Sequence, residues 1–196
     1  MKNKPKILIS ACLLGENCKY NGGNNADAIC AGELAKLRQI YELIAVCPEY
    51  LGGLPTPREP AEICSNGRVV TKFSGRDVTA EFLLGAQICA DIARENGCKI
   101  AILKERSPSC GSGEIYDGSF TGRLVSGDGL TAAVLKKLGV RIVGESALAE
   151  LDRLKELDGI HIIGHVTSPG QGCYLVTPDG AELRLRAQGW PDEAEG

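Results

Sequence analysis

The sequence is poor in aromatic residues, in net charge and in long apolar runs. Its 196 residues include one Trp, five Tyr and three Phe, and the formal net charge is −3 at pH 7. Proteins that coat nucleic acids need cationic surfaces to neutralise phosphates and aromatic rings to stack on bases. No segment approaches the roughly 18 consecutive apolar residues that span a bilayer. The composition therefore argues against a nucleic-acid partner and against a membrane-spanning protein.

A CxxC pair and an export signal are also missing, although the chain has nine cysteines. Zinc domains usually supply their ligands as close pairs, and an odd number of cysteines does not fit a secreted disulfide framework. Lys2, Lys4 and Lys6 precede ILISAC in the manner of a short lipoprotein signal, but only Ile7–Ile9 are strongly apolar before Cys12. An export segment needs about 7 to 15 apolar residues. We therefore expect a cytoplasmic protein with reduced thiols.

Two kinds of periodicity divide the chain. Short apolar runs alternate with helical periods up to about residue 157, as in a parallel sheet covered by helices. Strands are expected at 7–10, 43–46, 99–103 and 140–143, and helices at 33–39, about 77–97, 130–138 and 146–157. From residue 158 the period is 2, and TPDG between CYLV and AELRLRA is a hairpin signal. The sequence predicts an α/β domain at 1–157, with a Rossmann-like parallel sheet and helices on both faces, and a small antiparallel β meander at 158–196.

Three cysteines follow expected strands: Cys12 the first, Cys47 the second, and Cys110 the third, in a loop rich in Gly, Pro and Ser. Ligands of open parallel sheets gather outside the carboxyl ends of the strands, so these thiols would converge if the strands are neighbours. From the spacing alone, the site could be a metal or iron–sulfur centre with one open position, a redox thiol pair, or a set of inert buried thiols. Cys18, in the same loop as Cys12, could be an additional ligand or a neighbour of the site.

Four motifs resemble those of the thiouracil desulfurase family, a bacterial iron–sulfur family. They are SACLLGENCKYNGG, VCPEYLGGLPTPREPAE, GRDVT and LKERSPSCGSGEIYDGSF, in order between about residues 7 and 145. The resemblance implies a [4Fe-4S] enzyme whose cluster is bound by three cysteines, with one open iron that takes the sulfur of a thiolated uracil. It also implies a hydrolytic, non-redox removal of that sulfur from a 2-thiouracil-type pyrimidine, which gives uracil and hydrogen sulfide.

Carried over motif by motif, the resemblance makes Cys12, Cys47 and Cys110 the cluster ligands, Glu49 the general acid/base and Ser107 an assisting hydroxyl. A thiocarbonyl sulfur is soft and suits an open iron, which stabilises sulfide as it leaves. A carboxylate two residues from a ligating thiolate lies where water must be deprotonated.

Two further residues are candidates for binding the substrate. Ser109 could donate a hydrogen bond to the substrate or to the water, although serine beside proline is common in turns for backbone reasons. Arg58, with Glu62, could hold the polar edge of a pyrimidine, or could form an ion pair at the surface.

Other functions are compatible with the same residues. The substrate could be a thiolated nucleotide or a tRNA thiouridine, or the protein could be a non-catalytic iron–sulfur or thiol sensor, which would have no use for a base such as Glu49. The Gly-rich SGDG before the expected helix at 130–138 could bind a phosphate, or Ser126 or Asp128 could simply cap that helix. Cys89 and Cys98 are expected in the core.

Overall fold

The computed structural model of the chain describes residues 4–148, 173–176 and 182–185, which belong to two compact units, 1–148 and 149–196. The boundary expected at residue 157 and the helix expected at 146–157 fall almost entirely on residues 149–172, outside the described part of the chain, as does the IHIIGHV strand. Within the described part, no helix is long and apolar enough to cross a membrane.

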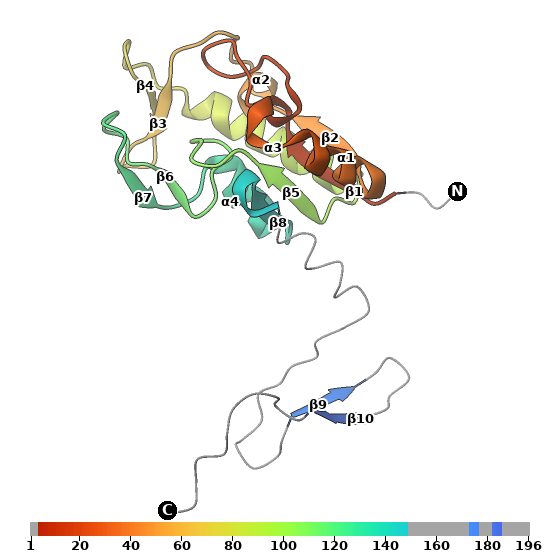
Figure 1. Cartoon of the computed structure of the whole chain (residues 1–196). Coiled ribbons are helices and arrows are strands. Elements are labelled where there is room, and N and C mark those ends of the chain that lie inside the picture. The colour runs from red at the N-terminus through yellow and green to blue at the C-terminus, as the bar shows by residue number, and fades with distance from the viewer. Residues whose placement is uncertain (1–3, 149–172, 177–181, 186–196) are drawn as a thin grey trace, which may run out of the picture. The chain divides into compact units, whose positions relative to one another are not determined.

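A four-stranded parallel sheet forms the centre of the first unit (Figure 1). Its strands are β1 (Lys6–Ser10), β2 (Glu42–Val46), β5 (Ile100–Leu103) and β8 (Arg141–Gly144), in the order β2-β1-β5-β8. The chain leaves β1 in one direction to form β2 and then crosses back to form β5 and β8. This reversal creates a crevice at the carboxyl ends of β1 and β5, which is where ligands of such sheets bind. The predicted α/β class and the four predicted strands are confirmed.

Helices cover both faces of this sheet because its crossovers run in two directions and each is right-handed. One face is covered by α3 (Thr79–Glu95) and α4 (Leu130–Lys137), whose Cys89 and Leu135 lie in one buried cluster with Leu8 of β1. Ile7 and Ile9 alternate with Leu8 and are equally buried against the opposite face. That face carries η1 (Ala11–Leu14), η2 (Ala26–Ala28) and α1 (Ala31–Ile40).

Three small antiparallel pairs complete the described structure, and the sequence predicted only the last of them. They are β3 (Ala61–Ile63) with β4 (Val69–Thr71), β6 (Glu114–Tyr116) with β7 (Leu124–Ser126), and β9 (Cys173–Val176) with β10 (Glu182–Leu185). The first two pairs have strands of three residues, too short to display an alternation. The third agrees with the TPDG hairpin signal.

A one-turn helix, α2 (Pro48–Leu51), follows β2 and is pressed against α3 through two glycines. A Cβ on Gly85 would stand 1.9 Å from the Pro48 carbonyl oxygen, and a Cβ on Gly52 would stand 1.9 Å from that of Glu81. Only residues without a side chain allow the two backbones to approach so closely. The position of α2 is therefore fixed by α3.

We expect Gly85→Ala to destabilise the protein by about 1–3 kcal/mol, because the added methyl group forces α2 and α3 apart. The measurement is the free energy of unfolding from urea titration. Gly32→Ala in α1 is the matched control, since the nearest atom to its new Cβ is 4.0 Å away. Equal stabilities of the two variants would contradict the close packing of α2 on α3.

Candidate active site

The ends of three parallel strands bring four cysteines to one cavity of about 500 Å³. Cys12 lies in η1 directly after β1, Cys47 follows β2, and Cys110 lies in the loop after β5. Cys18 reaches the same cavity from the loop between η1 and η2. The structure thus brings together on one cavity the three thiols whose convergence the sequence predicted, together with the fourth candidate.

Hydrogen bonds distinguish the thiols of this cavity. A hydrogen bond from the Cys18 thiol, assisted by one from Asn25 Nδ2 at 3.3 Å, lowers the pKa of Cys12 to about 7 although burial opposes the shift. Cys18 has a single thiol proton, which it can donate to Cys47 instead, and that hydrogen bond lowers the pKa of Cys47 to about 7. The same contacts raise the pKa of Cys18, which remains the protonated partner. Burial raises the pKa of Cys110.

The loop that carries Cys110 is anchored to the N-terminus of α4. Ser107 Oγ accepts hydrogen bonds from the backbone N–H groups of Ser109 and Cys110, each at 3.1 Å. The N–H groups of Leu130 and Thr131, at the start of α4, donate to the carbonyl oxygens of Pro108 and Ser109 at 3.0 and 2.9 Å. The Ser107 hydroxyl and the N-terminus of α4 together fix the backbone of the loop, and with it the position of Cys110.

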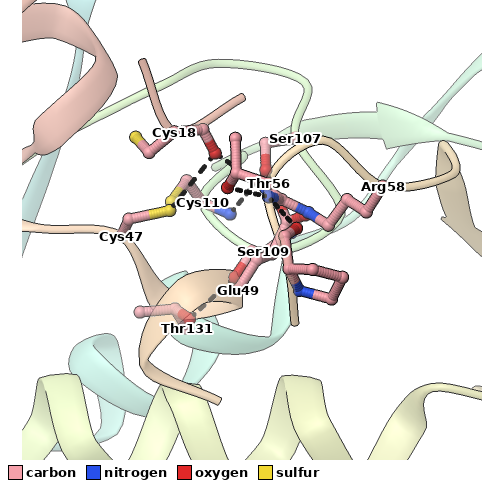
Figure 2. A network of polar contacts seen from close by, with 10 residues as sticks. Cys18, Cys47, Glu49, Thr56, Arg58, Ser107, Ser109, Cys110 and Thr131 are labelled. Atoms are coloured by element: carbon pink, nitrogen blue, oxygen red, sulfur yellow. Dashed lines mark hydrogen bonds and ion pairs between the residues drawn. The ribbon is translucent and has the colours of Figure 1, made fainter. Parts of the chain in front are cut away.

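Three expectations about this region are wrong. The SGDG segment does not offer a phosphate site, because the backbone N–H groups at the start of α4 already donate to the carbonyl oxygens of Pro108 and Ser109. The N-cap residue of α4 is Gly129, and not Ser126 or Asp128. The Ser109 side chain is fully buried, bonds Thr131 Oγ1 at 3.1 Å and does not line the cavity (Figure 2). Its hydroxyl therefore fastens the loop to α4 and is not available to a substrate in this conformation.

A buried ion pair joins the candidate base to the cysteine loops. Arg58 Nε donates to Glu49 Oε2 at 2.7 Å, and its Nη2 donates to the carbonyl oxygen of Cys18 at 3.0 Å. Figure 2 shows that carbonyl between the guanidinium and Cys47, whose thiol also donates to it at 3.7 Å. The Arg58 side chain is only 7% exposed, so the alternative of a surface ion pair is wrong.

Comparison with known proteins agrees with these motifs and their positions. The family model of the 2-thiouracil desulfurases matches residues 7–147. The uncharacterized protein YbbK of Bacillus subtilis is 44% identical over 154 residues, which are 74% of this chain and 99% of YbbK. The chain belongs to the 2-thiouracil desulfurase family. A solved structure of the [4Fe-4S]-dependent thiouracil desulfidase TudS superposes with a TM-score of 0.71 and 44% identity, covering 79% of this chain and 99% of TudS.

In this member of the desulfurase family, several cavity residues escaped the sequence reading. Tyr116 and Phe120 line the cavity and lie within one of the quoted motifs, but nothing in their spacing indicates that the β6–β7 hairpin meets β3 there. Glu62 of β3, which the sequence offered together with Arg58 as a candidate for binding the substrate, lines the same cavity. Lys104 also lines the cavity and forms an ion pair with Glu145 of η3 (Glu145–Ala147). Such contacts between distant segments depend on the tertiary fold.

The cysteines expected in the core of this family member are there. Cys89 and Cys98 are 0% and 3% exposed, and neither lines the cavity. Burial raises the pKa of Cys89 to about 12. These thiols are therefore held protonated and shielded, in contrast to Cys12 and Cys47.

In the cluster-free protein, we expect Cys18→Ala to slow alkylation of Cys47 by iodoacetamide at pH 7. Loss of the hydrogen bond would return the pKa of Cys47 from about 7 toward 9.0, and the thiolate is the form present above the pKa. Its fraction at pH 7 would then fall from about one half toward about one hundredth, and the difference would vanish above about pH 10. The measurement is peptide mass spectrometry at several pH values.

Cys64→Ala is the matched control, because Cys64 is also partly exposed but does not line the cavity. A rate at Cys47 that is equal in both variants at pH 7 would show that Cys18 does not ionise it.

Proposed function

We propose that this protein removes sulfur hydrolytically, without net redox change, from a 2-thiouracil-type pyrimidine, giving uracil and hydrogen sulfide. The observation that carries the proposal is the meeting of Cys12, Cys47, Cys110 and the Glu49 carboxylate on one cavity at the carboxyl edge of the sheet. Family membership and the likeness to TudS support the same chemistry.

The donor set fits an iron–sulfur cluster better than a single ion. Among the described residues, no three His, Cys, Asp or Glu side chains are arranged to hold one metal ion. Thiolates are the usual ligands of such clusters, and hydrogen bonding to Cys18 lowers the pKa of Cys12 and of Cys47 toward neutrality. Cys12, Cys47 and Cys110 would hold a [4Fe-4S] cluster, with Cys18 beside them. When bound, the cluster would supply an open Lewis-acidic iron for the thiocarbonyl sulfur.

Glu49 would act on the water that replaces sulfur. It lies in the first turn of α2, two residues after Cys47, and its side chain is 19% exposed. Its carboxylate would take one proton from water as the oxygen attacks the ring carbon and the second from the resulting hydroxyl as the carbonyl forms, and would pass both in turn to the departing sulfide, which leaves as hydrogen sulfide. Arg58, a substrate-binding candidate from the sequence, would act as a positioning residue, because protein acceptors engage four of its five N–H donors.

Ser107 would offer a hydrogen bond to the substrate or to the attacking water. Its oxygen accepts two backbone N–H groups of the Cys110 loop, so the hydroxyl proton is what remains for a ligand. Because Ser107 lines the cavity, this donor is fixed at the edge of the space in which the ring would lie.

A thiolated nucleotide is the second candidate substrate. Lys19 and Arg106 line the cavity, and neither forms an ion pair within the described residues. Free cations at a cavity that already has room for more than a pyrimidine favour a phosphate-bearing ligand. A comparison of kcat/KM for the thiolated base and for its 5′-monophosphate distinguishes the two candidates.

We expect Glu49→Gln to keep the iron and sulfide content of the reconstituted protein while uracil formation falls about 10²- to 10⁴-fold, because a base is lost but no ligand is. Iron and sulfide analysis and chromatography of the product measure both quantities. The control is Glu59→Gln, since Glu59 accepts hydrogen bonds from the backbone of Phe73 and Ser74 and does not line the cavity that holds the cysteines. Undiminished activity of Glu49→Gln would place water activation elsewhere.

We expect the anaerobically reconstituted protein to form many molecules of uracil per cluster without an electron donor. The thiocarbonyl carbon keeps its oxidation level when water replaces sulfide, so hydrolysis consumes no electrons. The measurement is uracil and sulfide released from 2-thiouracil over time. A single turnover that dithionite restores would refute the hydrolytic mechanism and assign the cluster to electron transfer.

A further inference from the structure

One wall of the cavity contains none of the proposed cluster ligands. It is built from strand β3, which contributes Glu62, and from the β6–β7 hairpin, which contributes Tyr116 and Phe120. These three residues bring together a carboxylate and two aromatic rings in a space next to the proposed reaction centre. A flat heterocycle with N–H groups on its edge matches such a wall, because rings stack on rings and carboxylates accept N–H.

Glu62 is buried but has one oxygen left for a ligand. Its residue exposure is 9%, and Oε2 accepts the backbone N–H of Phe120 at 2.9 Å. Oε1 has no hydrogen-bond partner among the described residues. Since every fully enclosed side-chain nitrogen or oxygen of those residues is hydrogen-bonded, Oε1 must remain accessible, and the cavity is the space that Glu62 lines.

The bond from Phe120 fixes the direction of this carboxylate. Phe120 has a φ of 57°, in the left-handed region that bulky residues rarely occupy. Such a conformation persists only where surrounding contacts hold it, and residues of this kind gather at ligand sites. The backbone N–H of a constrained loop therefore orients the carboxylate.

The other carboxylates of the cavity are engaged differently. Glu49 is paired with Arg58, and Glu105 accepts hydrogen bonds from the backbone and the hydroxyl of Ser146. Glu62, by contrast, accepts one hydrogen bond and forms no ion pair among the described residues, whereas Glu105 accepts two hydrogen bonds and Glu49 pairs with a cation. It is the acceptor best placed to receive an N–H from a ligand.

We propose that Glu62 is a specificity-determining residue that accepts the N3–H of the pyrimidine ring. This inference rests on the proposed function. N3–H adjoins the thiocarbonyl carbon in both 2-thiouracil and 4-thiouracil, so one acceptor at N3 orients either isomer. The carboxylate also excludes rings that carry a lone pair or a methyl group at N3, because these leave it unpaired or displaced.

The test is a cycle of two substrates and two proteins. 1-Methyl-2-thiouracil keeps N3–H, whereas 3-methyl-2-thiouracil lacks it, and both are assayed with the reconstituted wild type and Glu62→Gln. We expect the wild type to prefer the 1-methyl compound by roughly 10- to 100-fold in kcat/KM, the effect of one charge-assisted hydrogen bond. Gln keeps an oxygen for Phe120 but turns an NH₂ group toward the ring. We expect the preference to fall below about 3-fold.

Glu59→Gln is the matched control and should keep the wild-type preference. The ratio of two substrates measured on one preparation does not depend on how much protein is folded, so a merely structural role of Glu62 would leave it unchanged. Undiminished preference in Glu62→Gln, or no preference in the wild type, would overturn the proposal.

A binding measurement separates this proposal from the proposed function. Calorimetry measures the affinity of the same reconstituted proteins for uracil and for 3-methyluracil. We expect the wild type and Glu59→Gln to bind uracil more tightly than 3-methyluracil, and Glu62→Gln to show no such difference. If the wild type releases no sulfide from any substrate, the proposed function fails, and this comparison alone decides the role of Glu62. Equal binding of the two ligands to the wild type would then overturn it.

Discussion

The buried guanidinium of Arg58 is the contact on which the arrangement of the cavity depends. It reaches the Glu49 carboxylate, the Cys18 carbonyl oxygen, and the Pro55 carbonyl and Thr56 hydroxyl of its own loop. A charge that is so little exposed persists only where partners replace the water it has lost. One cation thus joins the loop after β1 to the helix after β2, and fixes the candidate base relative to the cysteines.

The topology of the sheet explains why these segments are within reach of one cation. Because β1 stands between β2 and β5, and all three strands are parallel, the residues that follow them emerge at the same edge. Each loop is then held by a different contact. Asn25 donates a hydrogen bond to Cys12, α3 packs against the helical turn that carries Glu49, and the start of α4 donates hydrogen bonds to the loop that carries Cys110. The site therefore combines a common position set by the fold with local contacts that are specific to each loop.

The sequence was sufficient for the features that depend on periodicity and on strand ends. The four strands of the sheet and the convergence of Cys12, Cys47 and Cys110 on one cavity follow from apolar runs and from the geometry of parallel sheets. Ser109 was misassigned because a serine beside a proline has the same local pattern whether its hydroxyl faces a ligand or a neighbouring helix. The sequence offered Glu62 only as a partner of Arg58. Its hydrogen bond to Phe120 could not be predicted, because the β6–β7 hairpin that supplies it lies more than fifty residues away in the chain.

The contact between α2 and α3 has a consequence for how the site meets its substrate. Glu49 stands on a helical turn whose backbone touches that of a long buried helix at Gly85, and its carboxylate is clamped by Arg58. A carboxylate on a free loop would lose its conformational entropy anew at each encounter with a ligand. In this protein the conformational entropy of the Glu49 side chain is lost when the chain folds, so the carboxylate is already oriented when a ligand binds.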